Sequence, residues 1–310
     1  MSKQLKADIF LLFITIIWGV SFVLIKDIIE EIPSFAYLTI RFALAFLILS
    51  VVYRKHFRKM SRKTIGRGFI IALMLFLGMS FQITGLKYTT ASNSALIMGF
   101  NVILVPVISG LFLKKKPEIS SIAGVLMAGC GIFILSGGIN LKFNIGDVLT
   151  LICAVGFAMQ IIFVDMFANE ENAIGLGVLQ IGFTALLSAG MWLKEGIEPF
   201  AISRELVITL VITSILGTAL AYVGQVIVQR FTSPTHTALI FTAEPVFGLI
   251  AALFIPDSNG VTETLTMRTV FGCILVLLGM LASEFDIKIK NMFYKIKKII
   301  LYARREYLQD

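Results

Sequence analysis

Long runs of apolar residues alternate with short polar segments along almost the whole chain. Ten runs are bounded by charged residues or by Pro and Gly, at Ile9–Ile25, Phe35–Tyr53, Phe69–Leu86, Ala91–Leu113, Ile119–Leu135, Val148–Val164, Ala173–Leu193, Leu206–Val228, Pro234–Ile255 and Met267–Ala282. Most are close to the roughly 17–25 residues that a helix needs to cross about 30 Å of hydrocarbon. Segments of about ten residues with alternating polarity, typical of a transmembrane barrel, are not found. The pattern therefore predicts an all-α integral membrane protein with ten transmembrane helices.

The composition excludes soluble domains, although 310 residues would be enough for two. Hydrophobic residues make up 57% of the chain and charged residues 15%, with a mean hydropathy of +0.91. Soluble proteins are about 45–50% apolar and about 25% charged. The net charge of +8 does not indicate nucleic-acid binding, because the placement of the charges matters more. Cys130, Cys153 and Cys273 lie inside apolar runs, without the spacing of disulfides or of a metal site, so we expect no metal and no cofactor.

The placement of Lys and Arg predicts the orientation of the spans. Of the 27 Lys and Arg residues, 20 fall on the side that carries the N terminus and 6 on the other side. The side richer in Lys and Arg is normally cytoplasmic. The first 26 residues lack a signal-peptide cleavage motif, so we expect the first span to be retained. The sequence thus predicts a protein of the bacterial cytoplasmic membrane with both termini in the cytoplasm.

The two halves of the chain resemble each other. The segment Thr89–Ile97 (TTASNSALI) matches Thr232–Ile240 (TSPTHTALI) at an offset of 143 residues. Further pairs recur at similar offsets: Gln82 with Gln225, Asn101 with Glu244, Gly124 with Gly272, and Gly131 with Gly279. These matches predict an internal duplication, with chance similarity between Ala-, Leu- and Gly-rich helices as the alternative.

We place a first repeat at residues 1–140, a second at 141–287 and a separate tail at 288–310. Because each repeat holds five spans, an odd number, the second must enter the membrane from the opposite face. This predicts two inverted five-helix repeats related by a pseudo-two-fold axis in the membrane plane. Such repeats are characteristic of secondary transporters, which bind substrate near the midplane between the halves.

Four motifs occur in a characteristic order, namely WGVSFVLIK at Trp18–Lys26, TIRFALA at Thr39–Ala45, YTTASNSALI at Tyr88–Ile97 and AEPVFGLIAAL at Ala243–Leu253. Together they resemble the drug/metabolite transporter superfamily, in its ten-helix EamA-like branch. The resemblance implies a transporter of amino acids or related metabolites, often an exporter.

Two polar residues lie deep inside predicted spans. Glu244 is ten residues into span nine, about 15 Å along a helix, and Asn101 is equally deep in span four. An ionisable residue at this depth must face protein or water. We expect both residues to bind substrate, and Glu244 to hold a cationic group or a coupling proton. The alternative is a structural or gating carboxylate beside Pro245, since the resembling family commonly has a Glu-Pro pair here.

Trp18, Gln82, Tyr222 and Gln225 are further substrate-binding candidates. Trp18 lies too deep in span one for an interfacial belt tryptophan, so its ring is free to stack on a substrate, to make a cation–π contact or to pack against neighbours. Tyr222 lies three residues before Gln225 and points to nearly the same helix face. We expect Gln82 and Gln225 to line the cavity, with hydrogen bonding between helices as the alternative.

Arg41, Gln160, Gln180 and His236 are assigned gating or structural roles. Arg41 lies about 12 Å along span two, where it could hold an anionic group, but the widespread Arg-Phe pair of the family favours an internal tether for helix ends. His236 is interpreted as a buried residue at a helix start, since His56, the other histidine, lies in a basic loop. No nucleophile–base pair, phosphate-binding loop or metal cluster is found in the sequence, so we expect neither an enzyme nor an ATP-driven pump.

The tail from Lys288 to Leu308 places apolar residues at helical spacing among seven Lys and Arg residues. This pattern predicts a basic amphipathic helix that binds anionic lipid at the membrane surface. A solvated charged tail is the alternative.

These features predict a secondary transporter that moves a small polar metabolite, such as an amino acid, by alternating access, with export as the expected direction. A proton or another ion is the expected coupling partner. The alternatives are an importer of a different small solute in the same fold, and a non-transporting membrane scaffold or sensor. A polar cavity inside the membrane, reached from one side, would favour a transporter over a scaffold.

Overall fold

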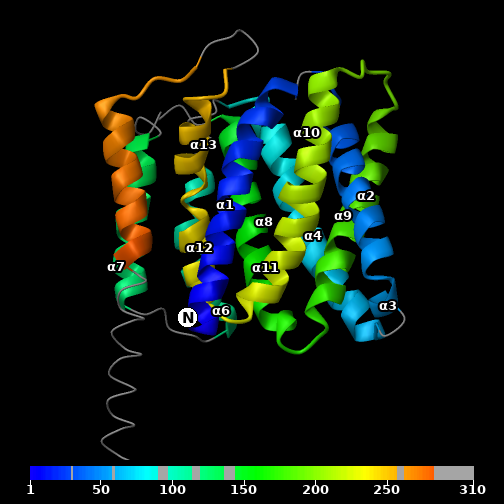
Figure 1. The fold of residues 1–310 in the computed structure, drawn as a ribbon, viewed down its shortest axis with the longest axis horizontal. Helices are drawn as coiled ribbons and strands as arrows, with labels where there is room; N and C mark the ends of the chain where they lie inside the picture. Colours follow the sequence, from blue (N-terminus) through cyan, green and yellow to red (C-terminus); the bar gives the residue numbers. More distant parts are fainter. Residues whose placement is uncertain are drawn as a thin grey trace, which may run out of the picture.

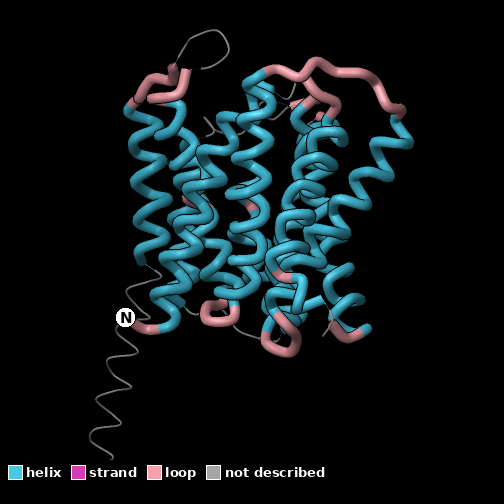
Figure 2. The backbone as a smooth tube through the Cα atoms, turned by 45° about the vertical axis from the view of Figure 1, so that its right-hand side comes forward, coloured by secondary structure: helices cyan, strands magenta, loops and turns pink. Residues whose placement is uncertain are grey.

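The computed structural model describes residues 1–28, 31–57, 60–89, 97–113, 119–135, 144–256 and 262–282. Within these ranges all regular structure is helical, and the long helices stand side by side in one bundle (Figure 1, Figure 2). In chain order the helices are α1 (Lys3–Ile28), α2 (Ser34–Val52), α3 (Arg54–Phe57), α4 (Arg62–Leu86), α6 (Asn101–Leu113), α7 (Ile119–Leu135), α8 (Ile145–Ala168), α9 (Ala173–Glu195), α10 (Arg204–Ser214), the π-helix η1 (Ile215–Leu220), α11 (Ala221–Gln229), α12 (Pro234–Phe241), α13 (Glu244–Ala252) and a last helix, Met267–Ala282. Residues 90–96, at the predicted start of span four, and the predicted tail helix lie outside the described residues.

Ten apolar helical segments in the described ranges coincide with the ten predicted spans. Seven of them are long and apolar enough to cross a membrane, judged by length and composition. The other three are the shorter apolar helices Ile97–Leu113, Ser121–Leu135 and Met267–Ala282. The all-α membrane fold predicted from the hydropathy pattern is therefore confirmed.

Polar caps explain why several helices begin before the apolar runs. The Ser61 hydroxyl accepts a hydrogen bond from the backbone N–H of Thr64 and caps α4 well before the apolar run begins at Phe69. At the start of α8, Asn144 and Asp147 form a reciprocal capping box. These side chains satisfy N–H groups that the first helical turn leaves without partners. Hydropathy marks the residues in hydrocarbon, whereas the caps mark where each helix begins.

The helix α7 crosses the last helix through glycines that recur between the two halves. A Cβ added at Gly124 would lie 2.6 Å from the carbonyl oxygen of Gly279, and one at Gly131 would lie 2.7 Å from that of Gly272. Gly124 corresponds to Gly272 in the repeat, and Gly131 to Gly279. Exchanging the two halves therefore turns one contact into the other. This reciprocity is what a two-fold axis through the crossing requires.

Helices from both halves also pack together along their lengths. The helix α4 lies along α8 and α9, and α1 lies along α11, α12 and α13. A Cβ added at Gly156 of α8 would lie 2.8 Å from the backbone nitrogen of Gly78 in α4, and one at Gly19 of α1 would lie 2.8 Å from the carbonyl oxygen of Glu244. Close backbone contact thus fixes span six against span three, and span one against span nine.

Candidate functional site

Spans four, eight and nine depart from regular α-helix near their middles. In span nine, α12 ends at Phe241 and α13 begins at Glu244 after a short turn. In span four, a turn at Phe100 precedes Asn101, the first residue of α6. In span eight, η1 separates α10 from α11. Interruptions of this kind inside membrane helices commonly accompany substrate and ion sites.

The turns in spans four and nine have the same geometry. The backbone N–H of Ala243 donates to the carbonyl of Ile240 at 3.1 Å, and that of Phe100 donates to the carbonyl of Ile97 at 3.1 Å. Both residues of the second bond lie 143 positions before their counterparts. Each half therefore starts a new helix at the same point of its repeat, inside the membrane.

Glu244 opens α13 with a partly exposed side chain that makes no hydrogen bond or ion pair within the described ranges. Its backbone carbonyl lies against Gly19 of α1. The N terminus of a helix favours negative charge. A carboxylate placed in this way is available to a cationic group or to a proton.

Trp18 packs into the protein beside this helix start. Its ring centroid lies 5.3 Å from that of Tyr222 and 4.9 Å from that of Phe241. The indole N–H donates to the carbonyl of Gly217 at 2.9 Å. The rings come from spans one, eight and nine, so Trp18 joins three spans around the point where span nine is interrupted.

Arg41 is held by η1. Its Nε donates to the Thr218 hydroxyl at 2.7 Å and its Nη2 to the carbonyl of Gly217 at 3.2 Å. The neighbouring Tyr37 hydroxyl donates to Thr213 at 3.0 Å. Because a π-helical turn disturbs the regular hydrogen-bond ladder, its carbonyls can accept from side chains of another span. The arginine is a tether, as the family resemblance implied, but it acts on a π-helix within span eight and not on helix ends.

Four buried glutamines form an amide network between spans six, seven and eight. Gln160 donates to Gln180 at 3.2 Å and Gln225 donates to Gln160 at 3.2 Å and to Gln229 at 3.1 Å. Gln180 in turn donates to the backbone carbonyl of Tyr222 at 3.2 Å. Gln225 therefore shows the hydrogen bonding between helices that was the alternative to a cavity wall, and substrate contact by Gln225 stays a prediction.

Gln82 and Asn101 are not linked by hydrogen bonds to the other candidates in the part of the chain that the structure describes. Gln82 is half-buried, and the side-chain oxygen of Asn101 is buried without a hydrogen-bond partner. The structure thus brings Trp18 and Tyr222 into contact beside the start of α13. The convergence of all six candidates on one cavity stays a prediction.

His236 lies at the start of α12, as predicted, with Nε2 3.7 Å from a carboxylate oxygen of Asp8. Both side chains are buried. Groups of three or more His, Cys, Asp or Glu residues that could hold a metal ion are not found among the described residues. His236 thus lies buried at a helix start, and its structural or gating role stays a prediction.

Sequence reasoning missed Phe241, Gln229 and the π-helical pair Gly217–Thr218. Phe241 lies three residues before Glu244, and Gln229 four residues after Gln225, so helical spacing carried a usable signal for both. The π-helix carries no such signal, because it depends on donors supplied by other spans.

Comparison with known proteins places this architecture among membrane transporters. The model of the EamA-like transporter family matches the chain twice, over residues 5–137 and 144–284. A protein of Archaeoglobus fulgidus named as an uncharacterized transporter is 32% identical over 280 residues, which cover 90% of this chain and 86% of the relative. The uncharacterized transporter YvbV of Bacillus subtilis is 23% identical over 287 residues, covering 89% of this chain and 91% of that protein.

A solved crystal structure has the same fold. It superposes with a TM-score of 0.71 over 90% of this chain and 96% of its own length, at 16% sequence identity. Similarity at this identity concerns the arrangement of the helices and carries no information on substrate.

Proposed function

The chain belongs to the EamA-like transporter family, and from this premise we propose that it is a secondary transporter that moves a small polar metabolite by alternating access. The family model matches each half separately, and the resemblance carried by the four motifs is confirmed. The family and its named relatives favour a transporter over an enzyme.

The observation that carries the proposal is the carboxylate of Glu244. It opens α13 inside the span, is partly exposed, and has no hydrogen bond or ion pair to the residues that the structure describes. An ionisable group in a membrane span is costly unless it faces protein, water or a ligand. A purely structural carboxylate would be expected to accept hydrogen bonds from a neighbouring helix. Its availability favours binding of a cationic group or a coupling proton.

The substrate class follows from the charges and rings near this carboxylate. Glu244 suits an amino group, and the Trp18 and Tyr222 rings offer an apolar wall of the kind found in small-molecule sites. Arg41 uses Nε and Nη2 for η1, which leaves Nη1 for a carboxylate of the substrate. We therefore propose an amino acid or a related compound, with export as the direction that the family resemblance implies.

Alternating access would use the duplicated architecture. We propose that the two halves rearrange about the axis that the reciprocal glycine contacts between α7 and the last helix indicate. Spans four and nine, each interrupted by a turn, are the segments that we expect to bend. The distribution of Lys and Arg supports a cytoplasmic location for both termini, in a bacterial cytoplasmic membrane.

The test is a thermal-unfolding screen of the purified protein against amino acids and related metabolites, followed by flux measurements in proteoliposomes. We expect a saturable ligand whose flux requires Glu244 and depends on the pH gradient. Vesicles of both orientations distinguish export from import. A broad panel without any stabilising ligand or saturable flux would contradict the transporter proposal and favour a scaffold or sensor.

A further inference from the structure

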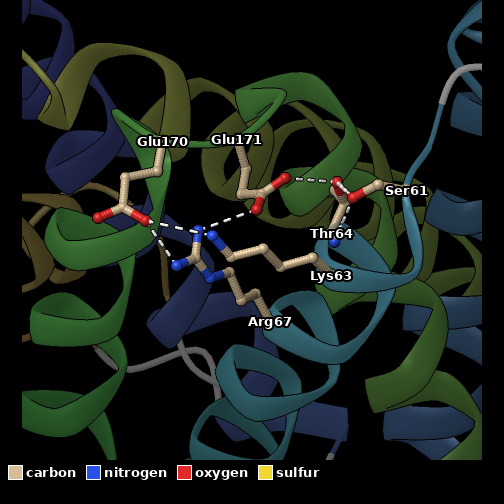
Figure 3. A network of polar contacts seen from close by, with 6 residues as sticks. All are labelled: Ser61, Lys63, Thr64, Arg67, Glu170 and Glu171. Atoms are coloured by element: carbon tan, nitrogen blue, oxygen red, sulfur yellow. Dashed lines mark hydrogen bonds and ion pairs between the residues drawn. The ribbon is translucent and has the colours of Figure 1, made fainter.

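An ion-paired cluster joins the two halves at the end of the bundle that carries the N terminus (Figure 3). Arg67 of α4 contacts Glu171 through Nη1 at 2.9 Å and Glu170 through Nη2 at 2.5 Å. Lys63 Nζ lies 3.8 Å from Glu170, and the Thr64 hydroxyl donates to Glu171 at 2.6 Å. The cations belong to α4 and the carboxylates to the α8–α9 connection. We call these five residues the inner clamp.

The inner clamp is partly buried and has a defined geometry, unlike an ordinary surface ion pair. The side chain of Arg67 is 17% exposed and that of Glu171 9% exposed. The Arg67 guanidinium also lies 4.9 Å from the centre of the Phe167 ring. A guanidinium fixed by two carboxylates and a ring has a defined geometry that a flexible surface lysine lacks. Glu170 is exposed, but the hydrogen bond and the charge of Arg67 lower its pKa, which keeps this carboxylate ionised.

A second contact joins the two halves at the opposite end of the bundle. There the Ser203 hydroxyl, which caps α10, donates to Glu31 at 2.6 Å. Ser203 lies 142 positions after Ser61, the residue that caps α4. At the same offset Arg67 corresponds to Thr209, a residue without a positive charge. The position of Arg67 thus carries a cation in the first half and a hydroxyl residue in the second.

We propose that Arg67 is the cytoplasmic gate residue of the transporter. By pairing with Glu170 and Glu171 it holds the cytoplasmic ends of the two halves together in this conformation, and these pairs separate when the site opens to the cytoplasm. Arg67 acts through the two glutamates and touches no substrate, so it is a positioning residue. An ion pair near solvent contributes little net stability, and it therefore biases the equilibrium between two conformations without locking it. The inference rests on the proposed function, because alternating access supplies the second conformation.

The test measures the width of the cytoplasmic end directly, without any substrate. In the full-length protein, with its three native cysteines replaced by alanine, nitroxide labels at Lys55→Cys and Asn169→Cys report the distance between α3 and the α8–α9 connection by pulsed dipolar spectroscopy. We expect Arg67→Ala to raise the population of a longer distance by a factor of about two to five. Arg62→Ala is the matched control, because it removes an exposed arginine from the first turn of the same helix without touching the clamp.

A charge-exchange variant distinguishes loss of the ion pair from misfolding. Charge exchange in Arg67→Glu/Glu171→Arg should return the distance distribution toward that of the parent protein, whereas Arg67→Glu alone should widen it. A second label pair at Lys87→Cys and Glu195→Cys, at the other end of the bundle, should not widen in Arg67→Ala. The gate proposal is overturned if Arg67→Ala keeps the parental distribution, or if Arg62→Ala widens it equally.

The two proposals fail separately. If Arg67→Ala widens the cytoplasmic end but the proteoliposomes transport no metabolite of the panel, Arg67 still controls the two conformations, and the transporter proposal is contradicted. If saturable flux is found while Arg67→Ala changes no distance, transport stands and Arg67 is not the gate.

Discussion

The turn before α6 in the first half and the turn before α13 in the second half are closed by hydrogen bonds at equivalent positions, yet different residues open the two helices. Asn101 opens α6 with a neutral amide whose oxygen is buried without a hydrogen-bond partner among the residues that the structure describes. Glu244 opens α13 with a carboxylate and is followed by Pro245, which has no backbone N–H to lose. The backbone has kept the symmetry of the duplication, and the side chains have not.

The shared backbone turns concern how the halves bend, whereas the different side chains concern what each half binds. Two equivalent helix starts inside the membrane give each half the same site of flexibility. A charge at both would double the cost of placing ionisable groups in hydrocarbon, and two carboxylates facing one site would also repel each other. With a carboxylate in one half and an amide in the other, we propose that one position binds a cation or a proton and that the other only hydrogen-bonds. The predictions below test this division.

The largest expected effect comes from Glu244→Gln, which makes the second helix start neutral like the first. We expect loss of substrate accumulation against a gradient and a flat pH dependence of the remaining flux, since the amide carries no exchangeable charge. Counterflow and gradient-driven uptake in proteoliposomes at several pH values are the measurements. Normal accumulation at every pH in Glu244→Gln, accompanied only by lower thermal stability, would make the carboxylate structural and remove the contrast between the two halves.

The next largest effect is expected where α7 crosses the last helix. Gly124→Ala and Gly272→Ala occupy equivalent positions. The methyl group added at position 124 would lie 2.6 Å from the carbonyl oxygen of Gly279, and the one added at position 272 would lie 2.6 Å from Cγ of Leu135 and 2.9 Å from the carbonyl oxygen of Gly131. We expect each to destabilise the protein by about 1–3 kcal/mol, as overpacking typically does, and by similar amounts. Thermal unfolding of the purified variants is the measurement. Gly190→Ala is the control, since nothing lies within 4 Å of its added Cβ, and strongly unequal effects would argue against a two-fold axis at this crossing.

The arrangement of the spans was largely predictable from the sequence, because hydropathy and internal repetition extend over long stretches of the chain. Apolar runs located the spans, and the glycine pairs that meet between α7 and the last helix were visible as recurring positions. The depth of Asn101 and Glu244 within their spans identified both as candidate site residues. The turns directly before them were not predicted, since only Pro245 in span nine gives a local signal for an interruption.

The polar interior was less predictable because it depends on contacts between distant spans. The hydrogen bond from Gln225 to Gln160 joins span eight to span six, and no spacing within span eight shows it. The partners of Arg41 are likewise not visible in the sequence, because they are a hydroxyl and a carbonyl group of the π-helix, 177 and 176 positions away. A sequence shows which polar groups need a partner, and the tertiary structure chooses that partner.

A smaller effect is expected from Asn101→Ala. The substitution removes an amide that the proposed substrate can hydrogen-bond, so we expect transport to fall several-fold, by about tenfold at most, which corresponds to one ordinary hydrogen bond. Its pH dependence should match that of the parent protein, because no charge is removed. Flux against pH is the measurement, with Asn169→Ala, an exposed amide at the end of α8, as control. An altered pH profile in Asn101→Ala would show that the first half shares in coupling.

The smallest expected effect is the response of the inner clamp to pH, which contrasts with the response of Glu244-dependent flux. Arg67, and secondarily Lys63, lower the pKa of Glu170 from its ordinary value of 4.5, so the attraction is complete above that value and is lost only as the pH falls through the lowered pKa. Arg67 and Lys63 on α4 and the neighbouring Glu171 are the charged groups in contact within the cluster.

Between about pH 6 and pH 8 the Glu170 carboxylate stays ionised, because its pKa is lowered from 4.5. The distance between labels at Lys55→Cys and Asn169→Cys should therefore stay constant over this range, while flux through the parent protein changes and flux through Glu244→Gln does not. A distance that widens on acidification toward pH 6 would place a coupling group in the clamp itself. The charge at the start of α13 would then no longer account alone for the difference between the two halves.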